Sequence, residues 1–176
     1  MIFQSIKTSD LSDGMINEIL TLKDSHWNFG IKSQKKWFLK YVMSNDIHNI
    51  IKFKKKIVGY TSLSYRSFNS SSSKKLSNEK KYILFATFII KRRFRNFFYA
   101  SKMMKFNNKV ILEKKKSSFL LCHKEKVNFY KFYGWTKLNS STFKVPDHKH
   151  SLIGMVFNFT RSNKNNKKIH KFFYYR

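Results

Sequence analysis

Apolar and polar residues follow a strand period and then a helix period between Lys81 and Glu113. From Tyr82 to Ile90 both alternating sets of residues are mostly apolar, which predicts a strand covered on both faces. A basic turn, Lys91 to Arg95, comes next. Apolar residues then recur at helical spacing, at Tyr99, Met103, Phe106 and Val110. The stretch therefore predicts a central strand, a basic turn and an amphipathic helix.

The chain before this stretch begins with a predicted strand and two predicted helices. Ile2 to Lys7 has the pattern of a short strand. Ser9 or Asp10 is expected to cap the helix that carries the apolar stripe from Met15 to Leu22. A second helix is expected from about Lys32 to Met43.

Two alternating runs predict a hairpin ahead of the central strand. Residues 48–53 and 57–65 are separated by the basic turn Lys54 to Lys56, which can join them as antiparallel neighbours. From Ser67 to Lys80 the composition becomes rich in serine, lysine and asparagine, with little to bury. This segment is expected to be a flexible loop.

The chain after the central unit predicts one more strand, a short helix that ends at Gly134, and a final pair of strands. The expected ranges are Ser118 to His123, Lys126 to Trp135, Thr136 to Val145 and Ser151 to Phe159, with a turn at Pro146 to His150. Residues 1–160 are expected to form a single domain, and residues 161–176 a basic and aromatic tail. For the tail, disorder and docking of Phe172 to Tyr175 both stay open. The elements predict a mixed α/β domain around one sheet.

Charge changes this picture only in part. The chain has 37 Lys and Arg against 9 Asp and Glu, a net charge of +28, which by itself favours nucleic acid, an anionic membrane or an acidic ligand. The excess is spread along the chain, however. A composition heavy in lysine, asparagine, phenylalanine and isoleucine is also typical of codon drift in an AT-rich genome, and this interpretation says nothing about partners.

The cysteine content and the lengths of the apolar runs indicate the cellular compartment. Cys122 is the only cysteine, so an intrachain disulfide is impossible and a reducing compartment fits. No CxxC or HxxxH pair is present to hold zinc, and no metal is expected. No apolar run reaches the roughly 18 residues of a membrane span, and the start lacks a signal-peptide core. A soluble cytoplasmic protein is the expectation.

Two motifs carry a resemblance to a known family. Residues 90–104, IKRRFRNFFYASKMM, are similar to a signature of the form RxxGxG/A, with Arg95 at its first position and Ala100 at its last. Residues 127–135, VNFYKFYGW, are similar to an FYxxxGF ending. With the order of elements, these motifs make the chain resemble the GNAT superfamily of acetyl-CoA-dependent acyltransferases over roughly residues 2–159.

The resemblance implies a fold and a cofactor site. The fold is a mixed, mostly antiparallel central sheet flanked by helices. The end of the central strand gives backbone groups to the pantetheine arm, and the basic turn with Arg92 and Arg93 serves the phosphates of coenzyme A. The implied cofactor-binding residues are Phe88, Ile89, Ile90, Arg95, Asn96, Phe97, Phe98, Tyr99, Ala100 and Lys102. Substrate contacts are implied near Trp27 and in the last strands.

Phe98 departs from the family pattern, which usually has glycine there. A left-handed conformation at Phe98 would cost about 1 to 2 kcal/mol. If the chain enters a right-handed helix early, with Asn96 as its cap, this cost does not arise. We expect the early helix.

The resemblance also implies catalytic groups. Tyr130 matches the general acid that returns a proton to the leaving thiolate. The central strand carries no carboxylate to act as a base. His123 is the first sequence candidate for a base and Glu125 the second, with His26 and Asp46 further away and a water chain as the alternative.

Three functions remain open at this level. The first is an N-acetyltransferase that moves an acetyl group from acetyl-CoA to a primary amine of a small molecule, an amino sugar or a protein. The second is a catalytically degenerate binding protein with the same fold. The third is a basic nucleic-acid-binding protein, although no helix-turn-helix, RRM or zinc signature supports it.

Overall fold

The computed structural model describes residues 1–71, 80–146, 151–159 and 169–174. The chain divides into two compact units. The first unit comprises Met1–Ser64 and Phe85–Val110, and the second comprises Tyr65–Leu84 and Ile111–Arg176. Each unit is described by itself below, and the domain boundary expected near residue 160 stays a prediction.

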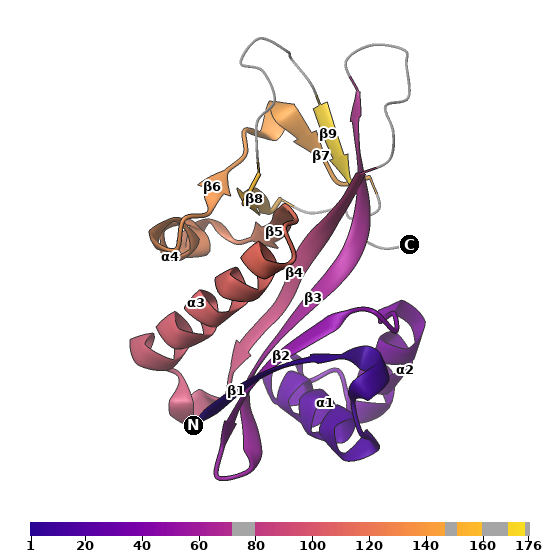
Figure 1. Ribbon diagram of the computed structural model, residues 1–176, viewed down its shortest axis with the longest axis vertical. Helices are drawn as coiled ribbons and strands as arrows, with labels where there is room; N and C mark the ends of the chain where they lie inside the picture. Colours follow the sequence, from indigo (N-terminus) through magenta and orange to yellow (C-terminus); the bar gives the residue numbers. More distant parts are fainter. Residues whose placement is uncertain (72–79, 147–150, 160–168, 175–176) are drawn as a thin grey trace. The chain divides into compact units, whose positions relative to one another are not determined.

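The first unit is built from β-strands with helices on both faces (Figure 1). Its strands are β1 Ile2–Lys7, β2 Ile47–Phe53, the start of β3 Lys56–Ser71 and the end of β4 Lys80–Ile90. Its helices are α1 Asp13–Trp27, α2 Ile31–Tyr41 and most of α3 Phe97–Glu113. β1 and β3 each pair with β2 in antiparallel fashion.

Consecutive strand residues supply the two layers of core in the first unit, because neighbouring side chains point to opposite faces of a sheet. On one face Ile50, Ile57 and Ile89 pack with Ile19 and Leu22 of α1. On the other face Ile51, Val58 and Ile90 pack with Met103 of α3. The central strand is therefore apolar on both sides because both of its faces are covered, as the sequence predicted.

Gly59 allows this second layer to close. A Cβ atom at Gly59 would lie 2.9 Å from Ile51 Cδ1 and 3.0 Å from Ile90 Cδ1. A larger residue would push both isoleucines out of the core.

The second unit contains the remaining strands and a short helix, all within the described residues. The strands are β5 Ser118–Cys122, β6 Thr136–Lys137, β7 Phe143–Lys144, β8 Ile153–Phe157 and β9 Ile169–Phe172, and the helix is α4 Val127–Phe132. β5 and β6 pair with β8, and β9 with β3, in antiparallel fashion. β4 pairs with β5, and β7 with β9, in parallel fashion. The predicted mixed, mostly antiparallel sheet flanked by helices is confirmed.

Phe172 lies at the centre of an aromatic core in the second unit. It is 1% exposed, and its ring stacks on Phe119 at 4.1 Å with an interplanar angle of 4°. Phe68 and Tyr82 contact the same ring at 5.4 and 5.2 Å. Of the two arrangements left open for the tail, Ile169–Phe172 adopts docking, while Tyr175 lies outside the described residues.

Three expectations about elements were wrong. Ser12, and not Ser9 or Asp10, caps α1, since its Oγ accepts the Met15 amide at 3.3 Å. Ser9 and Asp10 instead lie in the 3₁₀ turn Thr8–Asp10.

The other two corrections concern strand limits. The loop expected from Ser67 begins later, because β3 continues to Ser71, and Lys80 already belongs to β4. Residues 72–79 lie outside the described residues. The single strand expected over Thr136–Val145 is divided by a 3₁₀ turn at Ser140–Thr142, and its ends pair with different partners.

Candidate functional site

The basic turn after β4 holds one guanidinium in a fixed place. Arg95 donates from Nε and from Nη2 to the Ile90 carbonyl oxygen, each at 3.4 Å. Its Nη2 also lies 3.3 Å from Nδ1 of His26, at the end of α1. Because a guanidinium can only donate, His26 accepts this bond and is neutral. Burial and the neighbouring Arg95 charge lower the pKa of His26, which favours the same state.

The start of α3 is open to an anion. The first amides of a helix have no acceptor inside the helix and carry the positive end of its dipole. Asn96 Oδ1 accepts the amide of Tyr99 at 3.0 Å, so the cap predicted for Asn96 is confirmed. With Arg92 and Arg93 exposed immediately before it, this helix start has the features of an anion site.

Phe98 enters the helix without strain. It lies in the first turn of α3 and is not among the residues with positive φ. The early right-handed helix expected from the sequence is therefore present. The Phe98 side chain is 54% exposed, and its ring lies 5.6 Å from the ammonium of Lys102.

Thr87 interrupts the regular backbone of β4. Its φ is +60°, a conformation that β-branched residues rarely adopt. Ala86, Thr87 and Phe88 are half-buried, although Tyr82 to Phe85 before them are buried. Strain of this kind is common at functional sites. Thr87 directly precedes Phe88 to Ile90, the residues that the family resemblance assigned to cofactor binding.

Tyr130 lies in the second unit, on α4. Its ring packs against Phe129 at 5.2 Å and Trp135 at 6.1 Å. Its backbone carbonyl accepts the amides of Tyr133 and Trp135, which closes the turn that contains Gly134 at φ +82°. Burial raises the pKa of the Tyr130 phenol, and Cys122 and Tyr174 add to the shift. The phenol is therefore neutral and can serve only as a proton donor near neutral pH.

Cys122 is a core thiol in the second unit. Its Sγ lies 3.7 Å from Met155 Sδ. Burial, with the Glu125 charge as a smaller cause, raises the pKa of the thiol to about 11. The thiol is protonated at neutral pH, which disfavours nucleophilic chemistry.

The candidates for a base lie in different surroundings. His123 and Glu125 are exposed at the end of β5. Asp46 is fully buried, and its Oδ2 accepts the Met43 amide at 3.1 Å, which fixes the turn before β2. His26 orients Arg95, as described above.

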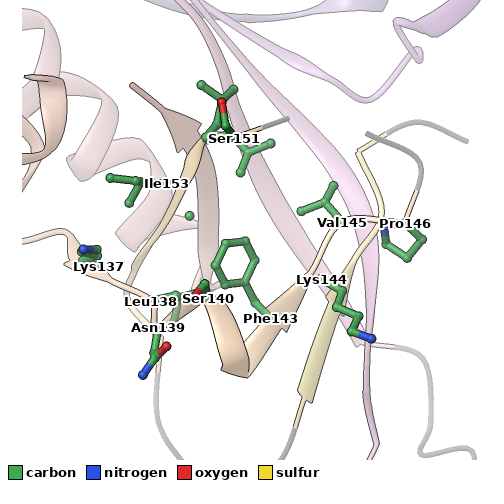
Figure 2. Close-up of a pocket in the computed structure, with 13 residues that line it drawn as sticks. Lys137, Leu138, Asn139, Ser140, Phe143, Lys144, Val145, Pro146, Ser151 and Ile153 are labelled. Atoms are coloured by element: carbon green, nitrogen blue, oxygen red, sulfur yellow. The ribbon is translucent and has the colours of Figure 1, made fainter. Parts of the chain in front are cut away.

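A cavity of about 1100 Å³ lies within the second unit (Figure 2). Phe143 forms one wall, with Ile153 and Val145 on other sides, and the Lys144 side chain extends away from the cavity. Phe143 packs on Gly154, where a Cβ atom would lie 2.6 Å from its Cζ. The lining is mainly apolar and suits the apolar part of a small molecule.

Two negative findings apply to the described residues. They contain no group of three or more His, Cys, Asp or Glu side chains placed to hold a metal ion. None of their helices combines the length and hydrophobicity that crossing a membrane requires.

Comparison with known proteins identifies the fold. No family model and no curated protein matches the sequence. The structure is similar to Escherichia coli ElaA (TM-score 0.62, 16% identity, 88% of this chain and 97% of that chain covered). It is also similar to an acyl-CoA N-acyltransferase from Pseudomonas aeruginosa (TM-score 0.65, 10% identity, 88% and 97% covered). A third similar structure is the Bacillus subtilis N-acetyltransferase YlbP in complex with coenzyme A (TM-score 0.56, 13% identity, 89% and 96% covered).

The chain has the GNAT fold. The resemblance stated from the two sequence motifs is thereby confirmed at the level of the fold. All ten residues assigned to cofactor binding lie on the β4, turn and α3 segment of the first unit, whereas Tyr130 and His123 lie in the second. Within the GNAT fold, the roles of these residues stay predictions.

A buried polar cluster in the first unit was missed from the sequence. Lys23 on α1 is 5% exposed, and its ammonium lies 4.0 Å from the centre of the Trp37 ring. Burial lowers the pKa of Lys23 to about 8. His48 lies 2.8 Å from Thr8 Oγ1 and 2.9 Å from Tyr60 Oη, and burial together with Lys23 lowers its pKa to about 4.

Neither this buried cluster nor the positive φ of Thr87 is predicted by a local sequence pattern. A lysine on a helix is almost always solvent-exposed, so Lys23 was left out of the α1 stripe. Thr87 has high strand propensity, which hides its unusual φ.

Proposed function

We propose that this protein is an N-acetyltransferase that moves an acetyl group from acetyl-CoA to a primary amine. The observation that carries the proposal is the fixed guanidinium of Arg95 beside the capped start of α3. A fixed cation and helix amides together are suited to a diphosphate. The GNAT fold supports the same assignment.

The proposal assigns the phosphates to the basic turn and the first turn of α3. Arg92, Arg93 and Lys102 are exposed and add positive charge around Arg95. The interruption at Thr87 would let Phe88 to Ile90 turn backbone groups toward the pantetheine arm.

In the proposed reaction the amine nitrogen attacks the thioester carbonyl carbon. A C–N bond forms, the C–S bond breaks, and the amine loses a proton to water. Tyr130 donates its phenolic proton to the thiolate and regains one from solvent. Its raised pKa keeps this proton in place at neutral pH but makes the transfer more costly than for an exposed tyrosine.

Calorimetric titration with acetyl-CoA tests the cofactor assignment. Arg95→Ala should weaken binding about 10- to 100-fold, since bonds to charged groups contribute about 1.5–3 kcal/mol each. Lys105→Ala, on the exposed side of the same helix, is the matched control and should bind as wild type. Absence of binding by the wild-type protein would contradict the proposal.

A binding protein without catalysis is the second candidate. It is favoured by the lack of any carboxylate from Tyr82 to Ile90 and by the exposed positions of His123 and Glu125. The two candidates differ in thiol release. An active enzyme should release free coenzyme A when acetyl-CoA is supplied with some amine of a broad panel, and Tyr130→Phe should slow that release about 100-fold or more.

The cavity of the second unit is proposed to hold the apolar part of the acceptor. Ile153→Asp would place a charge in its wall, where an apolar group could no longer be buried favourably. The KM for an apolar amine should then rise, while acetyl-CoA affinity stays unchanged. An unchanged KM would remove the cavity from the proposal.

A further inference from the structure

A series of four contacting aromatic rings on the first unit is bordered by three cations. Lys54 lies 5.9 Å from the Phe53 ring, and Phe53 contacts Phe94 at 5.3 Å. The Arg93 guanidinium lies 4.9 Å from the same Phe94 ring.

The sequence of contacts continues onto α3. Phe94 contacts Tyr99 at 5.4 Å, Tyr99 contacts Phe98 at 5.5 Å, and Lys102 lies 5.6 Å from the Phe98 ring. These seven residues, called the cation–ring strip below, are Phe53, Lys54, Arg93, Phe94, Phe98, Tyr99 and Lys102. They join the β2–β3 turn, the basic turn and the first turns of α3.

The strip is accessible and strongly basic. Its three cations are exposed, Phe98 is 54% exposed, and Phe53, Phe94 and Tyr99 are half-buried. Residues 52–56 contain four lysines, residues 91–102 contain five Lys or Arg, and neither segment contains Asp or Glu. The strip therefore concentrates positive charge beyond the even background of the chain.

Aromatic rings bordered by cations fit one class of partner. In a single-stranded polynucleotide every phosphate is followed by a flat base, and proteins bind it through cations that follow the backbone and rings that stack on bases. A helix that binds a membrane surface needs an exposed apolar face. The exposed large apolar side chains of α3 lie at its two ends, Phe97 and Phe98 in the first turn and Leu112 in the last, and Met103 and Val110 between them are buried, so α3 has no continuous exposed apolar face.

We propose that the cation–ring strip binds single-stranded polynucleotide, with phosphates on Lys54, Arg93 and Lys102 and a base stacked on Phe98. This function goes beyond acetyl transfer. Because the strip shares Arg93, Phe98, Tyr99 and Lys102 with the proposed coenzyme A site, acetyl-CoA should compete with the polynucleotide.

The charge contribution is tested by fluorescence anisotropy with labelled oligothymidine and oligouridine across a salt series. The double variant Lys54→Glu/Lys55→Glu should weaken binding and reduce the salt slope by about 0.7, since it removes the proposed phosphate contact of Lys54 and each contact contributes about 0.7 for single strands. The control variant Lys114→Glu/Lys116→Glu makes the same charge change in the second unit, at exposed lysines. It should bind both oligonucleotides nearly as wild type does.

Acetyl-CoA titration of the same variants separates this proposal from the enzymatic one. Lys54 and Lys55 lie outside the proposed coenzyme A site, so their reversal should leave acetyl-CoA affinity unchanged. Loss of oligonucleotide binding alone supports the strip, whereas wild-type protein that binds oligonucleotide but no acetyl-CoA refutes only the enzymatic proposal.

The stacking contribution is tested with Phe98→Ala. Loss of one base stack should weaken binding about 5- to 100-fold. Phe132→Ala is the matched control, because Phe132 is 70% exposed on α4. The wild-type protein should bind both oligonucleotides with similar affinity or bind oligouridine more tightly, and either result agrees with the proposal.

Three results would overturn the proposal that the cation–ring strip binds single-stranded polynucleotide. Equal weakening by both charge variants would show a diffuse attraction of the whole chain. Unchanged affinity of Phe98→Ala would remove the stacking role. Binding to phosphatidylserine vesicles in the absence of oligonucleotide binding would assign the strip to a membrane surface.

Discussion

Thr87 holds a left-handed backbone conformation, with φ at +60°, inside a strand. For a residue with a Cβ atom this conformation costs roughly 1–2 kcal/mol, and glycine avoids the cost. Since glycine also costs about 0.5–1 kcal/mol in backbone entropy, Thr87→Gly should raise the free energy of unfolding by up to about 1 kcal/mol, as measured by urea denaturation.

Thr136→Gly is the control for this prediction. Thr136 is an exposed strand residue that is not among those with positive φ. Glycine there should lower the free energy of unfolding by about 0.5–1 kcal/mol. If both substitutions destabilise equally, the strain assigned to Thr87 is absent.

The contribution of Lys23 to the free energy of unfolding should increase as the pH rises. Burial lowers its folded-state pKa to about 8 from the ordinary lysine value of 10.5. Between these values the unfolded chain binds more protons, so the contribution of Lys23 to stability rises with pH. Below pH 8 the buried charge costs the folded state up to about 3 kcal/mol.

Lys23→Met isolates this effect from the other lysines. The variant should be more stable than wild type below pH 8, and the difference should shrink as the pH approaches 10.5. The cation–π contact with Trp37, worth about 0.5–2 kcal/mol, offsets part of the gain. A difference that does not change with pH in urea denaturation would show that Lys23 titrates normally.

Two substitutions of Asn96, at the start of α3, distinguish its effect on stability from its effect on acetyl-CoA binding. Asn96→Ala removes the cap on the Tyr99 amide and should lower the free energy of unfolding by about 1 kcal/mol. Asn96→Asp keeps a capping oxygen and should preserve stability. Its negative charge should nevertheless weaken acetyl-CoA binding, measured by calorimetry. If the Asn96→Asp variant binds acetyl-CoA as tightly as wild type does, the phosphates do not bind at the start of α3.

The elements that the sequence predicted well are those with a strong apolar period. β1, β2, the start of β3, β4, α3 and β5 were placed within a few residues of their observed limits. The hairpin turn has positive φ at Lys54 and Lys55, which a basic turn without glycine did not suggest.

The elements that were misplaced depend on distant partners. β3 continues through a serine-rich segment because β9 pairs with Phe68 to Ser71. Residues 136–145 divide because β6 pairs with β8 while β7 pairs with β9. These partners lie 18 or more residues away in the sequence, and local composition contains no information about them.

At the scale of the whole chain, the last strand is part of the structure. Phe172→Ala should lower the free energy of unfolding by about 3–5 kcal/mol, because the ring is buried against Phe119, Phe68 and Tyr82. Phe132→Ala, on an exposed ring, should change it by less than about 0.5 kcal/mol. Equal small losses in urea denaturation would show that β9 is dispensable.

The fold class, the basic turn, the Asn96 cap and the early helix at Phe98 could all be predicted from the amino-acid sequence. These features follow from periodicity and from residue chemistry within a few positions, so one chain suffices to predict them. Four features could be seen only in the folded chain: the strain at Thr87, the pairing of Arg95 with His26, the burial of Lys23 and the docking of Phe172. Each of these depends on groups brought together from distant segments, and a local pattern does not encode the energy of such contacts.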